Sequence, residues 1–334
     1  MVSIAMATFN GAAFLPAQLE SLLSQTRQPD ELVVADDLST DATPDIVRAF
    51  ALTCPFPVRL EINDQRLGVA QNFNRALSLC TGDLVLLSDQ DDVWLPEKIA
   101  VLEQEALRNP DSSCFINDAL LADRELVPTG TTKRGQIRAA GLPDEAMVMG
   151  CCAAFRRSLL TCLLPIPTSQ RAHDNWLVQT ADLLHQTSRL DDCLQLYRRH
   201  GDNASDFFVN RLEQPNFIQG LIERAQGLVR KATHSGGLAD EQNFLATASQ
   251  RMSERQEEFI KLVGREHATC TLASTEARAR HLARRCAIRT LPRYRRFPEI
   301  SALWRDGGYA TSGKVPSVIK DMLISATREI ASTL

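Results

Sequence analysis

Long hydrophobic runs are missing from this sequence of 334 residues. Apolar segments such as 84–87 and 159–164 are far shorter than the roughly 18 residues that a membrane-spanning helix requires, so we expect no such helix. Aromatic residues are also few, at 6%, although hydrophobic residues make up 44% of the chain and charged residues 23%. This composition is typical of globular proteins and excludes a disordered, collagen-like or disulfide-stapled chain.

The sequence also lacks the features of secreted and zinc-binding proteins. Strand-like sequence begins at residue 2, where a secretory signal peptide would need a charged start followed by an apolar stretch. The nine cysteines show no Cys-x-x-Cys spacing. We interpret them as reduced, mostly buried thiols rather than disulfide partners or zinc ligands. These absences predict a cytoplasmic protein.

Glycine-rich phosphate-binding motifs are absent as well. No Gly-x-Gly-x-x-Gly follows a strand-like segment, and no complete P-loop, in which Gly-x-x-x-x-Gly-Lys precedes Ser or Thr, occurs. An EF-hand loop beginning at Asp89 would require an oxygen ligand at Val93 and a glycine at Trp94, and neither is there. A nucleotide, if one binds, would therefore be held by acidic side chains and a metal.

Charge is distributed unevenly along a chain whose formal net charge is -4. Residues 1–100 contain six basic and fourteen acidic side chains, whereas residues 275–334 contain twelve basic and five acidic ones. The two ends of the chain are therefore expected to have different roles.

Short apolar segments alternate with helix-type segments in the first part of the chain. Segments 4–7, 32–35, 58–62 and 84–87 have strand character, and segments 15–26, 44–52, 69–79 and 96–107 have helix character. This alternation predicts an α/β fold with a mostly parallel central sheet and helices on both faces. From about residue 207, long helix-type stretches replace it, at 212–233, 240–263 and 273–288. We therefore predict an α/β domain over residues 1–205 and a helical, basic region over residues 206–334.

Polar side chains follow three of the predicted strands. They lie in segments 8–11, 36–41 and 88–94, which are rich in carboxylates and hydroxyls. Ligands bind beyond the carboxyl ends of parallel strands, and closely packed carboxylates suit a hard divalent cation. Helix capping is the alternative interpretation of Asp41 and Asp92.

Several ordered motifs resemble the family 2 glycosyltransferases of the GT-A fold, over roughly residues 1–205. The motifs are segments 7–11, 24–26, 35–41, 68–74 and 87–94. The Ser-Asp-Gln-Asp-Asp-Val-Trp form of residues 88–94, together with Tyr-Arg-Arg-His-Gly-Asp-Asn at 197–203, is most similar to the bacterial rhamnosyltransferase-like branch. That branch builds O-antigens, capsules and exopolysaccharides.

The resemblance implies a nucleotide-sugar site at these positions. Thr8 would lie beside the nucleotide, and Asp37 would hydrogen-bond a uracil or thymine ring. Asp89 to Asp91 would form an Asp-x-Asp motif that binds Mg²⁺ or Mn²⁺, chiefly through Asp91, with Asp89 close to the ribose or sugar. The nucleotide-sugar-binding residues implied in this way are Thr8, Asn10, Asp37, Asp89, Gln90 and Asp91.

The resemblance also implies an acceptor side. Asp174 matches the aspartate that serves as general base in inverting members of the family, with His173 and Trp176 beside the acceptor. N-capping of the helix that follows is the alternative for Asp174. His200 would reach the diphosphate or the metal, and an ordinary surface loop is the alternative.

Together these features predict an inverting, metal-dependent glycosyltransferase. It would move rhamnose or a hexose from a UDP- or dTDP-sugar to a hydroxyl of a growing cell-surface polysaccharide or lipid-linked oligosaccharide. The alternative is a non-catalytic nucleotide-sugar-binding or partner-binding protein on the same fold. A nucleotidyltransferase would also use paired aspartates, but such enzymes usually have a glycine-rich phosphate loop near the N-terminus.

An arginine-rich segment near the C-terminus predicts a peripheral contact with the anionic inner leaflet of a membrane. Eight arginines lie between residues 278 and 296, with aromatic and aliphatic residues interleaved. Basic residues near such a surface each contribute about 1 kcal/mol to binding. The alternative is a solvated basic face that packs on the acidic N-terminal domain. No nucleic-acid-binding motif accompanies the segment, so we expect no nucleic acid partner.

Overall fold

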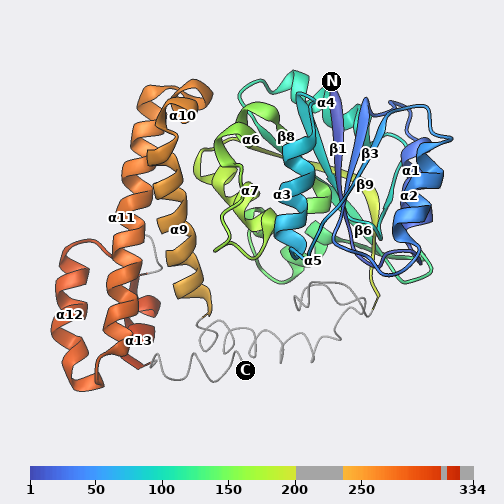
Figure 1. The fold of residues 1–334 in the computed structure, drawn as a ribbon. Helices are drawn as coiled ribbons and strands as arrows, with labels where there is room; N and C mark the ends of the chain where they lie inside the picture. The colour runs from blue at the N-terminus through green and yellow to red at the C-terminus, as the bar shows by residue number, and fades with distance from the viewer. Residues whose placement is uncertain (201–235, 310–313, 324–334) are drawn as a thin grey trace. The chain divides into compact units, whose positions relative to one another are not determined.

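The computed structural model describes residues 1–200, 236–309 and 314–323. The chain divides into two compact units, Met1–Glu213 and Gln214–Leu334 (Figure 1). Three features of the sequence prediction lie outside the described residues: the domain boundary at 205, the end of the motif at 201–203, and the helix expected over 212–233.

The described part of the first unit is built on a nine-stranded, mostly parallel sheet, which confirms the predicted fold class. The strand order is β3-β2-β1-β4-β8-β6-β9-β5, with β7 paired to β6. β8 runs antiparallel between β4 and β6, and β5 and β7 are also antiparallel to their neighbours. The strands are β1 (Val2–Thr8), β2 (Glu31–Asp36), β3 (Val58–Ile62), β4 (Leu84–Ser88), β5 (Val93–Trp94), β6 (Cys114–Ala122), β7 (Pro128–Thr132), β8 (Ala153–Arg156) and β9 (Thr187–Arg198).

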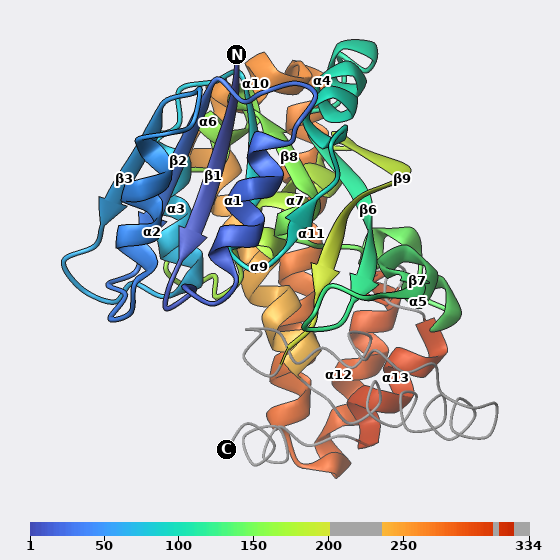
Figure 2. The same cartoon turned by 90° about the vertical axis from the view of Figure 1, so that its right-hand side faces the viewer.

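Helices cover both faces of this sheet. α3, α6 and α7 lie on one face, and α1 and α2 lie on the other (Figures 1 and 2). The helices of the unit are α1 (Leu15–Leu23), α2 (Thr43–Ala51), α3 (Val69–Leu79), α4 (Lys98–Arg108), α5 (Lys133–Ala139), α6 (Arg157–Leu163) and α7 (His173–Leu183), with short 3₁₀ turns η1 (Asp144–Ala146) and η2 (Gly150–Cys152).

The sequence periodicity explains this packing. Val2, Ile4 and Met6 alternate along β1 and enter one core cluster, since side chains two residues apart share a face of a strand. Leu15 and Leu19 on α1 belong to the same cluster, because residues four apart share a face of a helix. The parallel register pairs Thr8 with Asp36, and it therefore brings the polar ends of β1 and β2 to one edge of the sheet.

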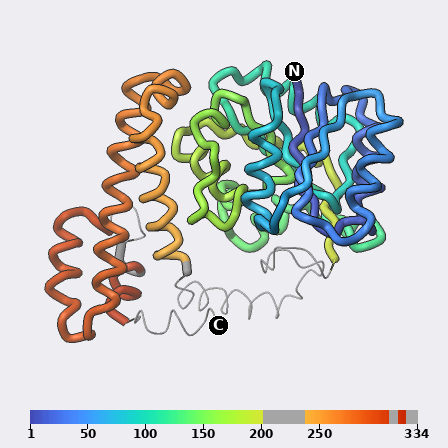
Figure 3. The backbone as a smooth tube through the Cα atoms, viewed as in Figure 1, coloured from blue at the N-terminus to red at the C-terminus, as the bar shows by residue number. Residues whose placement is uncertain are grey.

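The described part of the second unit is helical, as predicted. Its helices are α9 (Gly236–Glu254), α10 (Gln256–Val263), α11 (Arg265–Thr290), α12 (Arg293–Arg305) and α13 (Lys314–Leu323). α9 and α11 lie side by side (Figure 3). The single helix expected over residues 240–263 is two helices, with a break at Arg255. Within the described chain, no helix combines the length and the apolar character needed to cross a bilayer.

Some arginines of the arginine-rich segment are buried inside the second unit. The segment is therefore not the uniformly solvated basic face that was one expectation. Arg285, Arg289 and Arg296 are at most 5% exposed. Arg285 Nε and Arg289 Nε donate to the fully buried carboxylate of Asp321 (2.7 and 2.9 Å), which also accepts from Tyr309 Oη (2.9 Å). Arg285 and Arg289 therefore connect α11 to α13, and Arg296, which donates from Nη1 to Asp321 O (3.1 Å), connects α12 to α13.

Candidate active site

A buried carboxylate, Asp36, ties together the carboxyl ends of β1 and β2. The Thr8 hydroxyl donates to Asp36 Oδ2 (2.8 Å), and the Ser39 hydroxyl and N–H donate to the same carboxylate (2.6 and 2.8 Å). Thr8 is 1% exposed. Thr8 is therefore buried and holds the Asp36 carboxylate at this edge of the sheet. Its contact with a nucleotide stays a prediction.

Asp37, the predicted base-binding residue, has both carboxylate oxygens engaged by the chain. Oδ1 accepts from the Leu67 N–H (2.7 Å) and the Asn63 amide (3.0 Å). Oδ2 accepts from the Gly68 N–H (2.9 Å) and Arg66 Nε (3.3 Å). Burial disfavours the charged form, but these donors outweigh it and hold the pKa of Asp37 below its ordinary value. Asp37 thus fixes the loop that leads into α3, and its role in binding a base is untested.

Asn10 and Gln90 order the loop that follows β1. Asn10 has a φ of 46°, in the left-handed region that asparagine tolerates, and its side-chain oxygen accepts from the Thr40 N–H (2.8 Å). The Gln90 amide donates to Phe9 O (3.0 Å) and accepts from the Phe9 N–H (2.9 Å). Both residues therefore join the loops that follow neighbouring strands.

Gly11 makes the close approach of Gln90 possible, and replacing it should have a measurable cost. A Cβ at residue 11 would overlap the Gln90 side-chain amide. Gly11→Ala is expected to destabilise the protein by about 1–3 kcal/mol, because Gln90 must give up its two hydrogen bonds to Phe9. Urea denaturation measures this cost. Gly237→Ala is the matched control, because nothing lies within 4 Å of a Cβ at Gly237.

A double-mutant cycle tests the cause of that destabilisation. If the overlap with Gln90 is responsible, Gly11→Ala should cost much less in a Gln90→Ala background than in the native protein. Equal costs in the two backgrounds would show that Gly11 is required for another reason.

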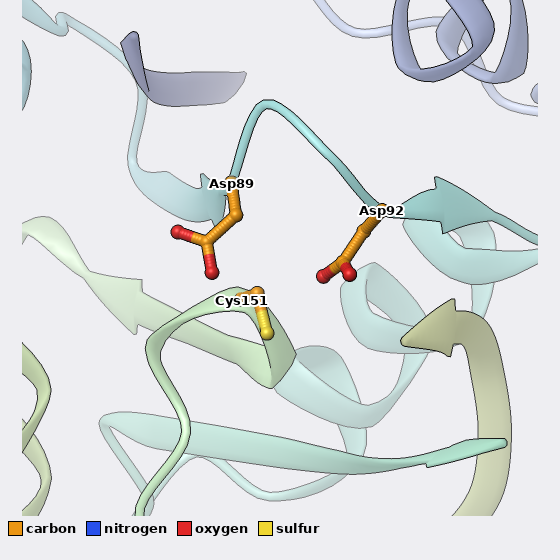
Figure 4. A group of neighbouring side chains, drawn as sticks. All are labelled: Asp89, Asp92 and Cys151. Carbon is orange, nitrogen blue, oxygen red and sulfur yellow. The ribbon is translucent and has the colours of Figure 1, made fainter. Parts of the chain in front are cut away.

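Two carboxylates from the turn after β4 face the sulfur of a cysteine from η2. Ligand atoms of Asp89, Asp92 and Cys151 lie within 4.8 Å of one another, and the three side chains point into one space (Figure 4). The sequence prediction paired Asp89 with Asp91 as metal ligands. Within the described residues, Asp92 and Cys151 are the partners that form a compact group with Asp89.

Asp92 and Asp41, two of the three residues for which helix capping was an alternative, have different roles. Asp92 is fully buried and accepts from the Gln195 amide (2.9 Å), while the N-cap of α4 is Glu97. The capping interpretation of Asp92 is therefore wrong. Asp41 Oδ1 accepts from the N–H of Thr43, the first residue of α2 (3.0 Å), so Asp41 stabilises the start of that helix.

Burial and mutual repulsion raise the pKa values of the acidic cluster. Burial is the main cause that raises the pKa of Asp89 to about 7, and the charges of Asp91 and Asp174 add to it. Burial, followed by the charges of Asp91 and Asp89, raises the pKa of Asp92 well above its ordinary range. A bound cation would relieve this repulsion, so the cluster has the electrostatics of a cation site.

Cys151 is a poor candidate ligand for a hard cation. A hydrogen bond to Cys152, together with burial, raises the pKa of the Cys151 thiol well above its ordinary value. The thiol therefore gives up its proton less readily than an ordinary cysteine, whereas metals bind the thiolate and hard cations prefer oxygen ligands.

The fully buried Lys98 ties the η2 turn to β9, because its Nζ donates to Cys151 O (2.7 Å) and to the Gln195 side chain. Burial lowers the pKa of Lys98.

Asp91 meets the end of β9. Its Oδ2 lies 2.9 Å from His200 Nε2, and the His200 ring stacks on Phe14 with 4.2 Å between centroids and 25° between planes. The His200 side chain is only 4% exposed, so it is not part of an ordinary surface loop. The fold thus brings together two residues that the sequence analysis assigned separately to the metal or the diphosphate.

Asp174 lies in the first turn of α7, next to η2. The N-cap of α7 is Ala172, so the capping interpretation of Asp174 is wrong. A Cβ on Gly150 would lie 3.4 Å from Asp174 Cβ and would overlap the His173 ring. Because η2 also contains Cys151, this close contact places Asp174 beside the acidic cluster, in agreement with its effect on the pKa of Asp89.

The packing of His173 and Trp176 does not fit their predicted place beside the acceptor. His173 is 7% exposed and stacks on Phe73 with 3.9 Å between centroids, and burial lowers its pKa. Trp176 is fully buried, and its indole N–H donates to Leu163 O (3.1 Å). Both side chains instead hold α7 against its neighbours, because Phe73 belongs to α3 and Leu163 to α6.

Sequence reasoning missed several residues that shape this region. Lys98 could have been found, since it shares a helix face with the buried Leu102 and would there need polar partners. Phe14 gave no comparable signal, because its contact with His200 joins segments 186 residues apart. The same holds for Phe9, whose ring lies 3.4 Å from Arg66 Cζ.

Comparisons with known proteins identify the class of this unit. Residues 3–164 match the family model described as Glycosyl transferase family 2. A protein of Nostoc sp. described as an uncharacterized glycosyltransferase is 26% identical over 214 residues, covering 60% of this chain and 66% of its own length. The dTDP-rhamnosyl transferase RfbG of Shigella flexneri is 36% identical over 98 residues, covering 28% of this chain and 34% of its own. The alignments thus span less than two thirds of these relatives.

A solved structure shows the same fold. TarS of S. aureus, residues 1–349 in complex with UDP, aligns with a TM-score of 0.52 at 19% identity. The alignment covers 84% of this chain and 89% of that one. At this identity the likeness concerns the fold, which is therefore of the predicted GT-A type.

Proposed function

Because residues 3–164 belong to glycosyl transferase family 2, we propose that the protein transfers a sugar from a nucleotide-sugar donor to an acceptor hydroxyl. One observation carries the proposal. The acidic turn after β4, the end of β9 and the first turn of α7 meet at one edge of the sheet. Parallel α/β sheets bind ligands at this edge.

The proposed donor is a UDP- or dTDP-linked sugar, rhamnose or a hexose. RfbG, described as a dTDP-rhamnosyl transferase, and TarS, solved in complex with UDP, support a pyrimidine nucleotide. We propose that the base meets the loop held by Asp37, beside the stacked pair of Phe9 and Arg66. Thr8, Asn10 and Gln90 would shape this part of the site through the bonds described above.

We propose that Asp91, whose Oδ2 lies 2.9 Å from His200 Nε2, holds Mg²⁺ or Mn²⁺ together with His200 and with Asp89 of the same turn. Carboxylate oxygens are the ligands that Mg²⁺ prefers, and imidazole suits transition metals, so this donor set serves either ion. Burial, and after it the charges of Asp91 and Asp174, raise the pKa of Asp89, and a bound cation would favour its charged form against all of these. When bound, such a cation neutralises the negative charge that develops on the departing diphosphate.

The proposed reaction is a single displacement with Asp174 as the general base. The acceptor oxygen attacks the anomeric carbon while the bond from that carbon to the nucleoside diphosphate breaks. The hydroxyl proton passes to Asp174, and the diphosphate leaves with the bonding electron pair, so the anomeric configuration inverts. The Asn175 N–H donates to Asp174 Oδ1 (2.8 Å) and orients the carboxylate.

The proposed acceptor is a growing cell-surface polysaccharide or a lipid-linked oligosaccharide. A relative from Escherichia coli that is 30% identical over 127 residues supports a lipid-linked acceptor, since it is described as a UDP-Glc:alpha-D-GlcNAc-diphosphoundecaprenol beta-1,3-glucosyltransferase. Within the first unit, Gly150 packs against His173 and Asp174 without room for a side chain.

A thermal-shift panel tests the donor site. In the presence of Mn²⁺, UDP or dTDP is expected to raise the melting temperature by several degrees, whereas GDP and CMP should raise it less. A ligand at one hundred times its dissociation constant stabilises the folded state by about 2.7 kcal/mol. EDTA should abolish the shift. Equal melting temperatures with and without all four nucleotides would contradict the donor site, and a shift that survives EDTA would contradict its dependence on a metal.

A further inference from the structure

Three large aromatic side chains are exposed along one face of α12. Tyr294 is 78% exposed, Phe297 67% and Trp304 45%. Their spacing of three and seven residues places them on a single stripe of a helix. Exposed aromatic residues that gather on one face mark an interaction surface, whereas scattered ones need no explanation.

Arginines flank this aromatic stripe. Arg293, Arg295 and Arg305 are exposed, and Arg295 Cζ lies 5.6 Å from the centroid of the Tyr294 ring. Of the two acids at this helix, Asp306 is paired with Arg284 (2.6 Å), and Glu299 lies roughly 140° around the helix from Tyr294. The charge beside the stripe is therefore predominantly positive.

The opposite face of α12 holds the helix in place, and Trp304, at one end of the aromatic stripe, also packs beside the buried Tyr309 ring with 6.0 Å between centroids. Ile300 and Leu303 belong to a buried cluster with Ile288 and Tyr309. The buried Arg296 donates from Nη2 to Arg289 O (2.8 Å) and from Nε to Leu291 O (2.8 Å). Replacement of Phe297, which is 67% exposed, should therefore leave the fold of this unit intact.

We propose that the Tyr294–Phe297–Trp304 face of α12 docks the protein on an anionic lipid bilayer. Helices that lie in a membrane interface combine aromatic side chains on one face with flanking basic residues, and Trp and Tyr favour the headgroup level. Each arginine near an anionic surface adds about 1 kcal/mol. The inference deepens the proposed function, since a lipid-linked acceptor would be presented at such a surface, but vesicle binding needs neither donor nor transfer.

Tryptophan fluorescence reports this docking directly. The chain has three tryptophans, and Trp94 and Trp176 are at most 2% exposed. A change of emission on membrane binding therefore comes from Trp304. Vesicles of phosphatidylglycerol and phosphatidylcholine should shift the emission of the full chain to the blue and sediment the protein at low salt. Phosphatidylcholine vesicles should do neither, and higher salt should release the protein because it screens the arginines.

Variants separate the aromatic stripe from the arginines. Phe297→Ser should weaken vesicle binding by about tenfold, because it removes one buried ring at the interface. The triple replacement of Arg293, Arg295 and Arg305 by serine should abolish the preference for anionic vesicles. Leu52→Ser, an exposed apolar residue of the first unit, and Arg280→Ser on α11 are the matched controls and should bind as the native chain does.

Three results would overturn the inference. They are an unchanged Trp304 emission with anionic vesicles, equal binding by Phe297→Ser and the native chain, and a blue shift that appears without vesicles as protein concentration rises. The last result would assign the stripe to a second copy of the chain. The nucleotide thermal shift, measured on the same preparation, shows separately whether the donor site is intact.

Discussion

Replacement of Asp174 by asparagine is expected to lower the rate of sugar transfer by about 10²–10⁴-fold and to leave donor affinity nearly unchanged. Asparagine keeps the size of the side chain and can still accept the Asn175 N–H, so the first turn of α7 should persist. It cannot take up the proton of the acceptor hydroxyl. The loss should therefore fall on turnover, measured with the donor identified by the thermal-shift panel.

Asp45→Asn is the matched control for this experiment. Asp45, like Asp174, is an acidic residue in the first turn of a helix, but it lies on the exposed surface of α2. Near-native turnover of Asp174→Asn would eliminate Asp174 as the base. A native chain that binds donor but transfers no sugar to any tested acceptor would instead favour a non-catalytic nucleotide-sugar-binding protein.

The sequence predicted the parallel half of the sheet because local patterns determine it. Residues 58–62 and 69–79, for example, coincide with β3 and α3 to the residue. The antiparallel strands were beyond such reasoning. β5 has only two residues, and β8 pairs with β4 and β6 through contacts that no local periodicity encodes. Their positions matter for function, because η2 immediately precedes β8 and contacts Asp174.

The candidate site was predictable to the extent that strand ends determine it. Asp89 and Asp91 follow β4, and the order of the strands alone brings them to the edge of the sheet. The partner of Asp91 at that edge is His200, and it could not be predicted, because tertiary packing positions the His200 ring against Phe14. Burial is equally invisible in a motif, so Trp176 was assigned to the acceptor side although its ring is in the core.

For the arginine-rich segment, the sequence identified the region, and the structure was needed to separate its buried residues from its exposed ones. The sequence placed eight arginines and several aromatic residues in one segment without separating them by role. The structure divides them: Arg285 and Arg289 pair with Asp321 inside the second unit, whereas Tyr294 and Phe297 remain exposed. Net charge alone would have overestimated the basic surface available to a membrane.

Asp91→Asn is expected to act in opposite directions on the two forms of the protein. Without metal, the variant should melt at a higher temperature than the native chain, because the charge of Asp91 contributes to the raised pKa values of Asp89 and Asp92. Removing that charge lowers the repulsion and should lower the pKa of Asp89 from about 7. With Mn²⁺ and nucleotide, the gain in melting temperature should largely disappear, and donor affinity should fall by about tenfold or more.

This pair of opposite effects distinguishes a metal ligand from a residue that only supports the fold. Replacing a residue that only supports the fold would lower the melting temperature in both conditions. Replacing a cation ligand would raise the melting temperature of the metal-free protein, because repulsion falls, and would weaken the binding of the metal and the nucleotide. Asp64→Asn, at an exposed acid that follows β3, is the matched control and should change neither quantity. If Mn²⁺ and nucleotide raised the melting temperature of Asp91→Asn as much as that of the native chain, Asp91 would not be a metal ligand. Asp89 and Asp92 would then remain as the carboxylates of this turn that are placed to bind a cation.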